Sequence, residues 1–209
     1  MEKRNWKRSV TLKQRMVLCL AAFFAAFALQ LALNGYQARA VQQVQDDQMG
    51  NFNAISRFQG GVESSISILE AYRWENGETE EMLEKLRAAC STSNAWLWRI
   101  RFNMDGLQNV SDEQWVLYGA VETTYGSYSA LLEELEGCLS SGQDAKASQL
   151  YYNKVSVCGG YLSQYTMQLL KASILDAQTT YTEISELGER IALMQIVVVA
   201  LCVALGCAS

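Results

Sequence analysis

The residues most suited to binding chemistry are arginines in an otherwise acidic part of the chain. Acidic residues outnumber basic ones between residues 39 and 190, yet Arg57 and Arg73 lie there within one expected helix. A guanidinium group presents a planar fork of donors that matches a carboxylate or a phosphate. Arg57 and Arg73 are therefore candidate contacts for an anionic ligand. The alternative is that each is a solvated surface residue paired with a nearby glutamate.

Two glycine pairs, Gly60-Gly61 and Gly159-Gly160, fall inside segments that otherwise favour helix. Glycine in a helix interior costs about 1 kcal/mol relative to alanine, so a pair calls for a reason. One interpretation is a signal-transmission hinge, where one helix shifts against another. The other is that the missing side chains let large aromatic residues pack against the backbone. The pattern leaves both open.

The composition argues against catalysis and against metal binding. The chain has no histidine, which is the commonest general base and a common metal ligand. Cys90, Cys138 and Cys158 are widely spaced, form no CxxC pair and leave their pairing state open. We therefore expect no catalytic residue, no metal and no cofactor in this segment, which we predict is not itself an enzyme. Its acidic balance also argues against nucleic acid as a partner.

The elements that must position these residues are four helices with apolar stripes of 3–4 spacing. The first is expected from residue 36 to about 74, the second from Thr79, the third from Ser111 and the fourth from Asp144. The first stripe contains Phe52, Ile55, Val62, Ile66 and Leu69. The second contains Leu83, Leu86, Cys90, Ser93, Leu97, Ile100 and Met104. The third contains Tyr118, Val121, Tyr125, Tyr128, Leu132, Leu135 and Leu139. The fourth contains Tyr151, Val155, Cys158, Leu162, Tyr165, Leu169 and Ala172.

The connections between these stripes read as helix ends. Asn76-Gly77 and Ser140-Ser141-Gly142 supply stops, because glycine takes the left-handed position after a helix freely. Ser111 with Gln114 forms a capping box, in which each side chain bonds the other residue's backbone N–H. Four amphipathic helices joined by short turns predict an all-α fold, an antiparallel up-down four-helix bundle flanked by two transmembrane helices.

The flanking spans are predicted from two runs without charge. Residues 16–36 follow a basic, cytoplasmic N-terminus (1–15), and residues 191–209 form a second run. The bundle, residues 37–190, would then be extracytoplasmic, in a multi-pass protein of the cell (plasma) membrane with the lipid bilayer as a partner. A rival reading of the first run is a signal peptide cleaved after Ala40. The second run lacks a charged cytoplasmic flank, so we expect the chain to have been cut there.

This order of elements resembles the sensor half of bacterial transmembrane receptors. The order is a basic N-terminus, a span at Met16–Leu33, a helical region and a second span at Ile191–Gly206. It is similar to that of sensor histidine kinases and, as a second choice, to that of methyl-accepting chemotaxis receptors. The resemblance covers the whole chain and rests on architecture. It implies a homodimer through the first and fourth helices and a small-molecule or protein stimulus. It also implies a signal that passes along the fourth helix and the second span to a kinase domain beyond residue 209. The competing class is a two-span, membrane-anchored interaction protein without signalling output.

Overall fold

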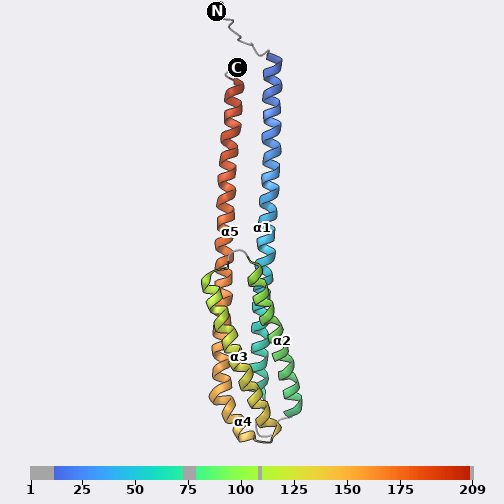
Figure 1. Cartoon of the computed structure of the whole chain (residues 1–209), viewed down its shortest axis with the longest axis vertical. Coiled ribbons are helices and arrows are strands. Elements are labelled where there is room, and N and C mark those ends of the chain that lie inside the picture. Colours follow the sequence, from blue (N-terminus) through green and yellow to red (C-terminus); the bar gives the residue numbers. More distant parts are fainter. Residues whose placement is uncertain (1–11, 73–78, 108–109, 208–209) are drawn as a thin grey trace, which may run out of the picture. The chain divides into compact units, whose positions relative to one another are not determined.

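The computed structural model describes residues 12–72, 79–107 and 110–207, and these ranges contain helices and no strand. The elements are α1 (Leu12–Ala71), α2 (Thr79–Gly106), α3 (Asp112–Ser140), α4 (Asp144–Leu150), a π-helical turn η1 (Tyr151–Val155) and α5 (Ser156–Cys207) (Figure 1). The prediction of an all-α fold is confirmed. The predicted Asn76-Gly77 stop lies outside the described residues.

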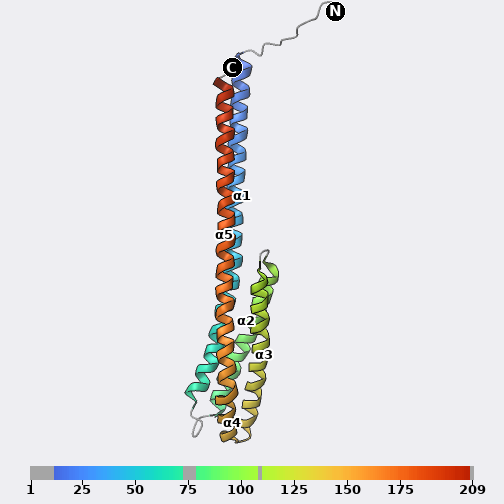
Figure 2. The same cartoon turned by 90° about the vertical axis from the view of Figure 1, so that its left-hand side faces the viewer.

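The chain divides into two compact units, which are described separately. Residues 44–180 form what we call the bundle unit, and residues 1–43 with 181–209 form the paired-helix unit. Both α1 and α5 contribute residues to each unit. The bundle unit has four helical arms that run side by side (Figures 1 and 2). The first three are α1, α2 and α3, and the fourth arm is made of α4, η1 and α5.

The predicted transmembrane helices are not found. In the part of the chain that the structure describes, no helix has a stretch both long and apolar enough to cross a bilayer. The prediction of a multi-pass membrane protein, with spans at 16–36 and 191–209 and an extracytoplasmic segment at 37–190, is therefore wrong for these residues. The prediction rests on two uncharged, largely apolar runs and on the basic residues before the first of them, and these sequence features do not by themselves establish a span.

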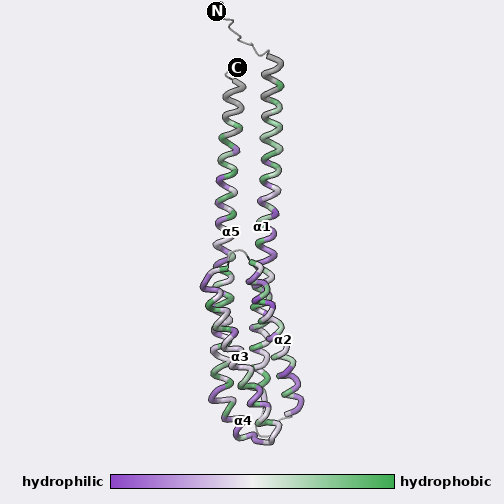
Figure 3. Tube along the Cα trace, in the orientation of Figure 1, coloured by the Kyte–Doolittle hydropathy of each residue, from purple (hydrophilic) through white to green (hydrophobic). Residues whose placement is uncertain are grey.

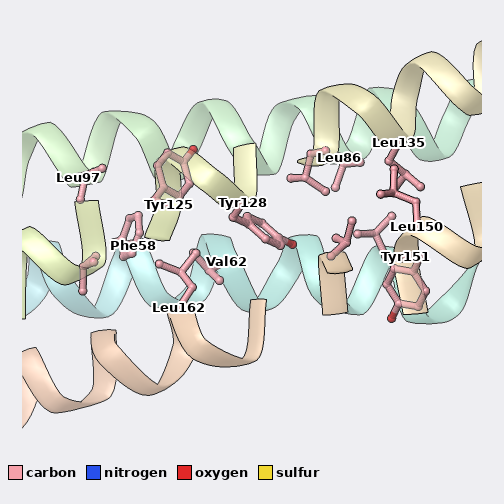
Figure 4. Packing of buried hydrophobic residues seen from close by; sticks show 14 of the residues in the cluster. Phe58, Val62, Leu86, Leu97, Tyr125, Tyr128, Leu135, Leu150, Tyr151 and Leu162 are labelled. Atoms are coloured by element: carbon pink, nitrogen blue, oxygen red, sulfur yellow. The ribbon is translucent and has the colours of Figure 1, made fainter. Parts of the chain in front are cut away.

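The bundle unit has a core to which every helical arm contributes (Figure 4). Phe58, Leu135 and Leu162 are completely buried, and they come from α1, α3 and α5. The stripes predicted for α2, α3 and the fourth arm are confirmed, with Cys90, Cys158 and Tyr165 half-buried. The stripe of α1 is partly wrong, because Phe52 is 39% exposed and Phe58, which it omits, faces the core.

The turn after α3 ends the helix as its glycine predicts. Gly142 has a φ of +68°, in the left-handed region that glycine adopts without a steric penalty. The N–H of Gly142 donates to the carbonyl of Leu139 at 3.0 Å, and the N–H of Gln143 donates to that of Cys138 at 2.9 Å. This pair of bonds is the Schellman motif, which satisfies carbonyls that the helix end would otherwise leave free.

The N-terminus of α3 is capped differently from the prediction. The Ser111 hydroxyl accepts a bond from the N–H of Gln114 at 3.3 Å, as expected. The N–H of Ser111, however, donates to Asp176 Oδ2 of α5 at 3.1 Å, so the Gln114 side chain does not fill that role. A carboxylate is favoured at the positive end of a helix dipole. Asp176 therefore links the start of α3 to α5.

The paired-helix unit consists of the first part of α1 and the last part of α5. The two helices approach closely at Gly188, where the Gln37 side chain occupies the space that a Cβ atom would need. Hydrophobic residues recur along both helices (Figure 3). Many of them are exposed in this unit, whose described residues form two helices.

Candidate functional site

Gly159 is the glycine of the fourth arm that packs against other helices. A Cβ atom at this position would lie 3.1 Å from Ile66 Cδ1 and 3.2 Å from Tyr128 Cε2. Both distances are shorter than ordinary van der Waals contacts between carbons. The absence of a side chain therefore lets the Tyr128 ring of α3 and the Ile66 side chain of α1 rest directly on α5. This geometry matches the interpretation in which glycine accommodates an aromatic neighbour.

Of the other three predicted glycines, one lies against a neighbouring helix and two face open space. A Cβ atom on Gly61 would collide with the Ser93 hydroxyl of α2. Gly60 and Gly160 have no such neighbour within 4 Å. One glycine of each pair is therefore closely packed. Gly61 of α1 and Gly159 of α5 both make their contacts near residues 61–66 of α1. We call this level of the bundle the glycine layer.

Tyr128 anchors this layer through a buried hydrogen bond. Its hydroxyl lies 2.9 Å from Ser65 Oγ, and the Ser65 hydroxyl donates to the carbonyl of Val62 at 2.7 Å. A serine has one proton to donate, so Tyr128 is the donor to Ser65. Burial raises the pKa of Tyr128, which keeps its hydroxyl protonated at neutral pH. The bond ties α3 to α1 at the level where Gly159 meets both.

Tyr125 makes a second link, one turn earlier on α3. Its hydroxyl donates to the carbonyl of Cys90 on α2 at 2.8 Å, and its ring packs edge to face on Phe58 at 5.4 Å (Figure 4). Burial, together with the nearby Cys90, raises the pKa of Tyr125 to about 12. Two tyrosines of α3 thus bind α1 and α2 through neutral hydroxyl groups inside the core.

The cysteines of the bundle unit are free thiols: Cys90, Cys138 and Cys158. Burial, with Glu136 nearby, raises the pKa of Cys90 to about 11, and burial also raises that of Cys158. A reactive cysteine needs a lowered pKa, because the thiolate is the nucleophile. Cys90 and Cys158 are accordingly packing residues, and the Sγ of Cys158 contacts the carbonyl of Thr124 at 3.7 Å.

The π-helical turn η1 lies immediately before this layer. The N–H of Ser156 donates to the carbonyl of Tyr151, five residues earlier, in place of the usual four. The sequence predicts an uninterrupted helix here, because neither a proline nor another breaker marks the turn. Such a turn holds one more residue than the α-helix beside it and is common at functional sites. Tyr151 and Val155 of the turn face the core, so the extra residue is taken up without loss of the stripe.

Polar side chains of α1, α3 and α5 are buried near Ser173 of α5, about four turns beyond Gly159. Asn51 Nδ2 donates to Ser173 Oγ at 3.1 Å, and Asn51 is fully buried. Asn51 Oδ1 and Gln114 Oε1 lack hydrogen-bond partners. A buried acceptor without a partner costs about 1–3 kcal/mol. This end of the bundle is therefore less well satisfied than the layer around Tyr128.

The predicted ligand-binding arginines are not brought together with these residues. Arg57 is exposed on α1, and Arg73 lies outside the described residues. The tyrosine hydroxyl bonds, the π turn and the Asn51–Ser173 pair are absent from the sequence-based prediction. The tyrosines do lie on the predicted stripe of α3, but neither their partners nor the π turn leaves a signal in residue spacing.

The fourth arm meets its neighbours through packing contacts and hydrogen bonds. Among the described residues, no group of three or more histidine, cysteine, aspartate or glutamate side chains is placed to hold a metal ion. The fourth arm contacts its neighbours through Gly159, which follows the π turn, and through Ser173 and Asp176 further along α5. Comparison with known proteins finds no matching family model, no matching curated protein and no matching solved structure.

Proposed function

We propose that the bundle unit is the stimulus-sensing part of a signalling receptor of the sensor histidine kinase kind. A small-molecule or protein stimulus favours one packing of α5 over another, and α5 carries the change toward an output domain. A chemotaxis receptor would use the same change. Two copies of the chain act together through α1 and the fourth arm, and an anionic stimulus would contact Arg57 or Arg73.

The observation that carries this proposal is the π turn η1 directly before Gly159. A switch needs an element with two arrangements that differ by only a few kcal/mol. Moving or removing the extra residue of a π turn changes the rotation and the rise of the helix that follows. Gly159 presents no side chain that would lock α5 against Tyr128 and Ile66. The fourth arm therefore combines a π turn, whose rearrangement would rotate α5, with a contact at Gly159 that has no side chain to hold α5 in one position.

A second function, binding of a protein partner without signalling, has its own support. Trp98 and Phe102 are each 68% exposed, one turn apart on α2. The guanidinium carbon of Arg99 lies 5.2 Å from the centre of the Phe102 ring. Exposed aromatic residues and arginine are enriched at protein interfaces.

The test uses the full chain fused through α5 to the catalytic core of a sensor histidine kinase. Gly159→Ala adds a methyl group against Ile66 and Tyr128, whereas Gly160→Ala, the matched control, adds one where nothing lies within 4 Å. We expect Gly159→Ala to change autophosphorylation about fivefold or more, the usual scale of coupling between two states. Gly160→Ala should leave it unchanged.

A third variant tests the same layer without the added methyl group, which could by itself disturb folding. Tyr128→Phe removes the bond to Ser65 without adding volume and should also shift autophosphorylation. Hydrogen exchange of each variant reports whether the bundle is still folded. Folded variants whose autophosphorylation matches that of the parent would overturn the signalling function. Loss of a protein partner on Trp98→Ala, with autophosphorylation unchanged throughout, would establish the second function instead.

A further inference from the structure

Two stretches of the bundle unit are basic, although the unit as a whole is acidic. Residues 48–62 of α1 and residues 85–104 of α2 contain no aspartate and no glutamate. The basic residues of these stretches are Arg57, Lys85, Arg87, Arg99 and Arg101. A local excess of positive charge attracts anions, so the partners of these side chains decide whether any of the charge is available.

Three of the five basic residues already pair with carboxylates. The partners are Glu81 for Lys85, Glu136 for Arg87, and Glu122 with Asp105 for Arg101. In the described part of the chain, no carboxylate pairs with Arg57 or Arg99, and both side chains are exposed. A guanidinium group without a carboxylate keeps its fork of N–H donors for another oxyanion.

Two contacts show how α1 and α2 lie against each other. A Cβ atom on Gly61 of α1 would collide with the Ser93 hydroxyl of α2, and one on Gly50 would lie 3.9 Å from Asn103 Nδ2. Residue numbers rise along α1 while they fall along α2, so the two helices are antiparallel neighbours here. We call the line along which residues 50–61 meet residues 93–103 the α1–α2 seam.

This register places Arg57 and Arg99 at nearly the same level of the seam. At about 1.5 Å per residue, Arg57 lies about 6 Å from Gly61, and Arg99 lies about 9 Å from Ser93 on the facing helix. The two levels therefore differ by about 3 Å. Arg57 is four residues from Gly61, and Arg99 is four residues from Asn103, so each shares the side of its helix that meets the other. Because both are exposed, they lie at the outer edge of the seam.

The Arg99 guanidinium is stacked on a ring of its own helix. Its central carbon lies 5.2 Å from the centre of the Phe102 ring. A cation–π contact of this kind engages the face of the guanidinium and leaves the N–H groups at its edge for a planar oxyanion. The amide of Asn103, which approaches Gly50 across the seam, adds further N–H donors beside it.

We infer that the outer edge of the α1–α2 seam binds a small oxyanion, a carboxylate or a phosphate, between Arg57 and Arg99. The Asn103 amide is the third source of donors. The small size follows from the charge of the unit. Within a Debye length of about 8 Å the anion meets the basic stretches, whereas a large polyanion would also meet the acidic surface beyond them.

This inference deepens the proposed function, and it rests on that function only for the role of the anion as the stimulus. It gives Arg57 a definite partner on another helix and places the anion across the contact between α1 and α2. The charges and the register that carry it do not depend on whether a signal passes along α5.

The first experiment follows the arginine Nε–H signals of the purified full chain, labelled with ¹⁵N-arginine, by NMR. Inorganic phosphate and succinate are titrated separately at constant ionic strength and pH 7. We expect the Arg57 and Arg99 signals to shift together, with one dissociation constant below about 10 mM for at least one of the two anions. The tighter of the two then identifies phosphate or carboxylate as the preferred group. The absence of saturable shifts with both anions would overturn the inference, as would shifts produced by pentaglutamate alone, which would point to an acidic protein partner.

The second experiment compares single substitutions in the same titration. Arg57→Gln and Arg99→Gln should each raise the dissociation constant about tenfold or more, because each removes a charge-assisted hydrogen bond. Arg87→Gln, at an exposed arginine of α2 that pairs with Glu136, is the matched control and should change it little. Hydrogen exchange reports whether each variant is folded. Equal weakening by all three substitutions would mean that the anion responds to overall charge, and this site would be withdrawn.

The outcomes separate this inference from the proposed function. Anion binding that depends on Arg57 and Arg99, together with unaltered autophosphorylation of Gly159→Ala, would retain the site and remove the signalling proposal. Altered autophosphorylation of Gly159→Ala without anion binding would retain the signalling proposal and remove the site.

Discussion

The two units of the chain are built from the same helices, α1 and α5, yet they satisfy their side chains differently. In the bundle unit, α2 and α3 close around α1 and α5, and side chains such as Phe58 are completely buried. In the paired-helix unit there is no third helix among the described residues, and Phe24 is 61% exposed. The same helices are therefore covered in one unit and largely exposed in the other, according to the number of neighbouring helices.

The contrast also extends to polar groups. In the bundle unit, Tyr125 and Tyr128 place their hydroxyl groups on buried acceptors from other helices. In the paired-helix unit, Gln195 has a buried amide N–H with no acceptor. Buried polar groups fix one arrangement when they are paired, and they cost free energy when they are not. We therefore expect the bundle to resist local unfolding more strongly than the paired helices.

The largest test of this contrast removes a phenylalanine from each unit. Phe58→Ala should lower the free energy of unfolding of the bundle by about 3–5 kcal/mol, because it opens a cavity beside Tyr125. Phe24→Ala should change it by less than about 0.5 kcal/mol, as expected for an exposed residue outside that unit. Hydrogen exchange of peptides from α2 and α3 measures both. An equal loss from Phe24→Ala would mean that the two units unfold together.

A smaller effect is expected at the glycine layer, where neighbouring positions give opposite signs. Gly61→Ala should destabilise the bundle by about 1–3 kcal/mol, because the new methyl group meets the buried Ser93 hydroxyl. Gly60→Ala faces open space and should stabilise the helix by up to about 1 kcal/mol.

The double variant Gly61→Ala with Ser93→Ala sharpens this prediction. It removes the hydroxyl that the methyl group meets and should recover much of the lost stability, which a double-mutant cycle detects by denaturant unfolding. A cost at Gly61 that does not depend on Ser93 would show that the clash is not its cause.

Much of the bundle follows from sequence, because helix periodicity and turn residues are local. The stripes of α2 and α3 and the stop at Gly142 can be read from spacing alone. Tertiary partners cannot be read in this way. Asp176 lies 65 residues from Ser111, yet it accepts the hydrogen bond from the Ser111 N–H that was predicted for Gln114. No local sequence pattern indicates this partner. The π turn is hidden for a related reason, since its extra residue leaves the spacing of Tyr151 and Val155 unchanged.

The prediction of membrane spans fails for a different reason. A run without charge is compatible with a bilayer, with a buried core and with a helix interface, so composition alone does not decide among them. The glycine pairs show the same limit at smaller scale. Their spacing indicates that a special contact exists, but only the packed structure distinguishes Gly61 and Gly159 from Gly60 and Gly160.

The smallest predicted effect concerns the ionisation of a buried tyrosine in the bundle unit. The pKa of Tyr125 is raised to about 12 from its usual value of 10, because burial disfavours the charged form. Its contribution to stability is therefore complete below pH 10 and is lost as the pH rises from 10 toward 12. Tyr125→Phe should cost about 0.5–1.5 kcal/mol at neutral pH, because the bond to Cys90 is lost, and it should reduce the fall in stability above pH 10. Tyr36→Phe, at an exposed position of the paired-helix unit, is the control and should leave both quantities unchanged. Denaturant unfolding at pH 7, 10 and 11 measures the effect. A fall above pH 10 that is as steep in Tyr125→Phe as in the parent would assign it to other groups and remove Tyr125 as a distinguishing feature of the bundle core.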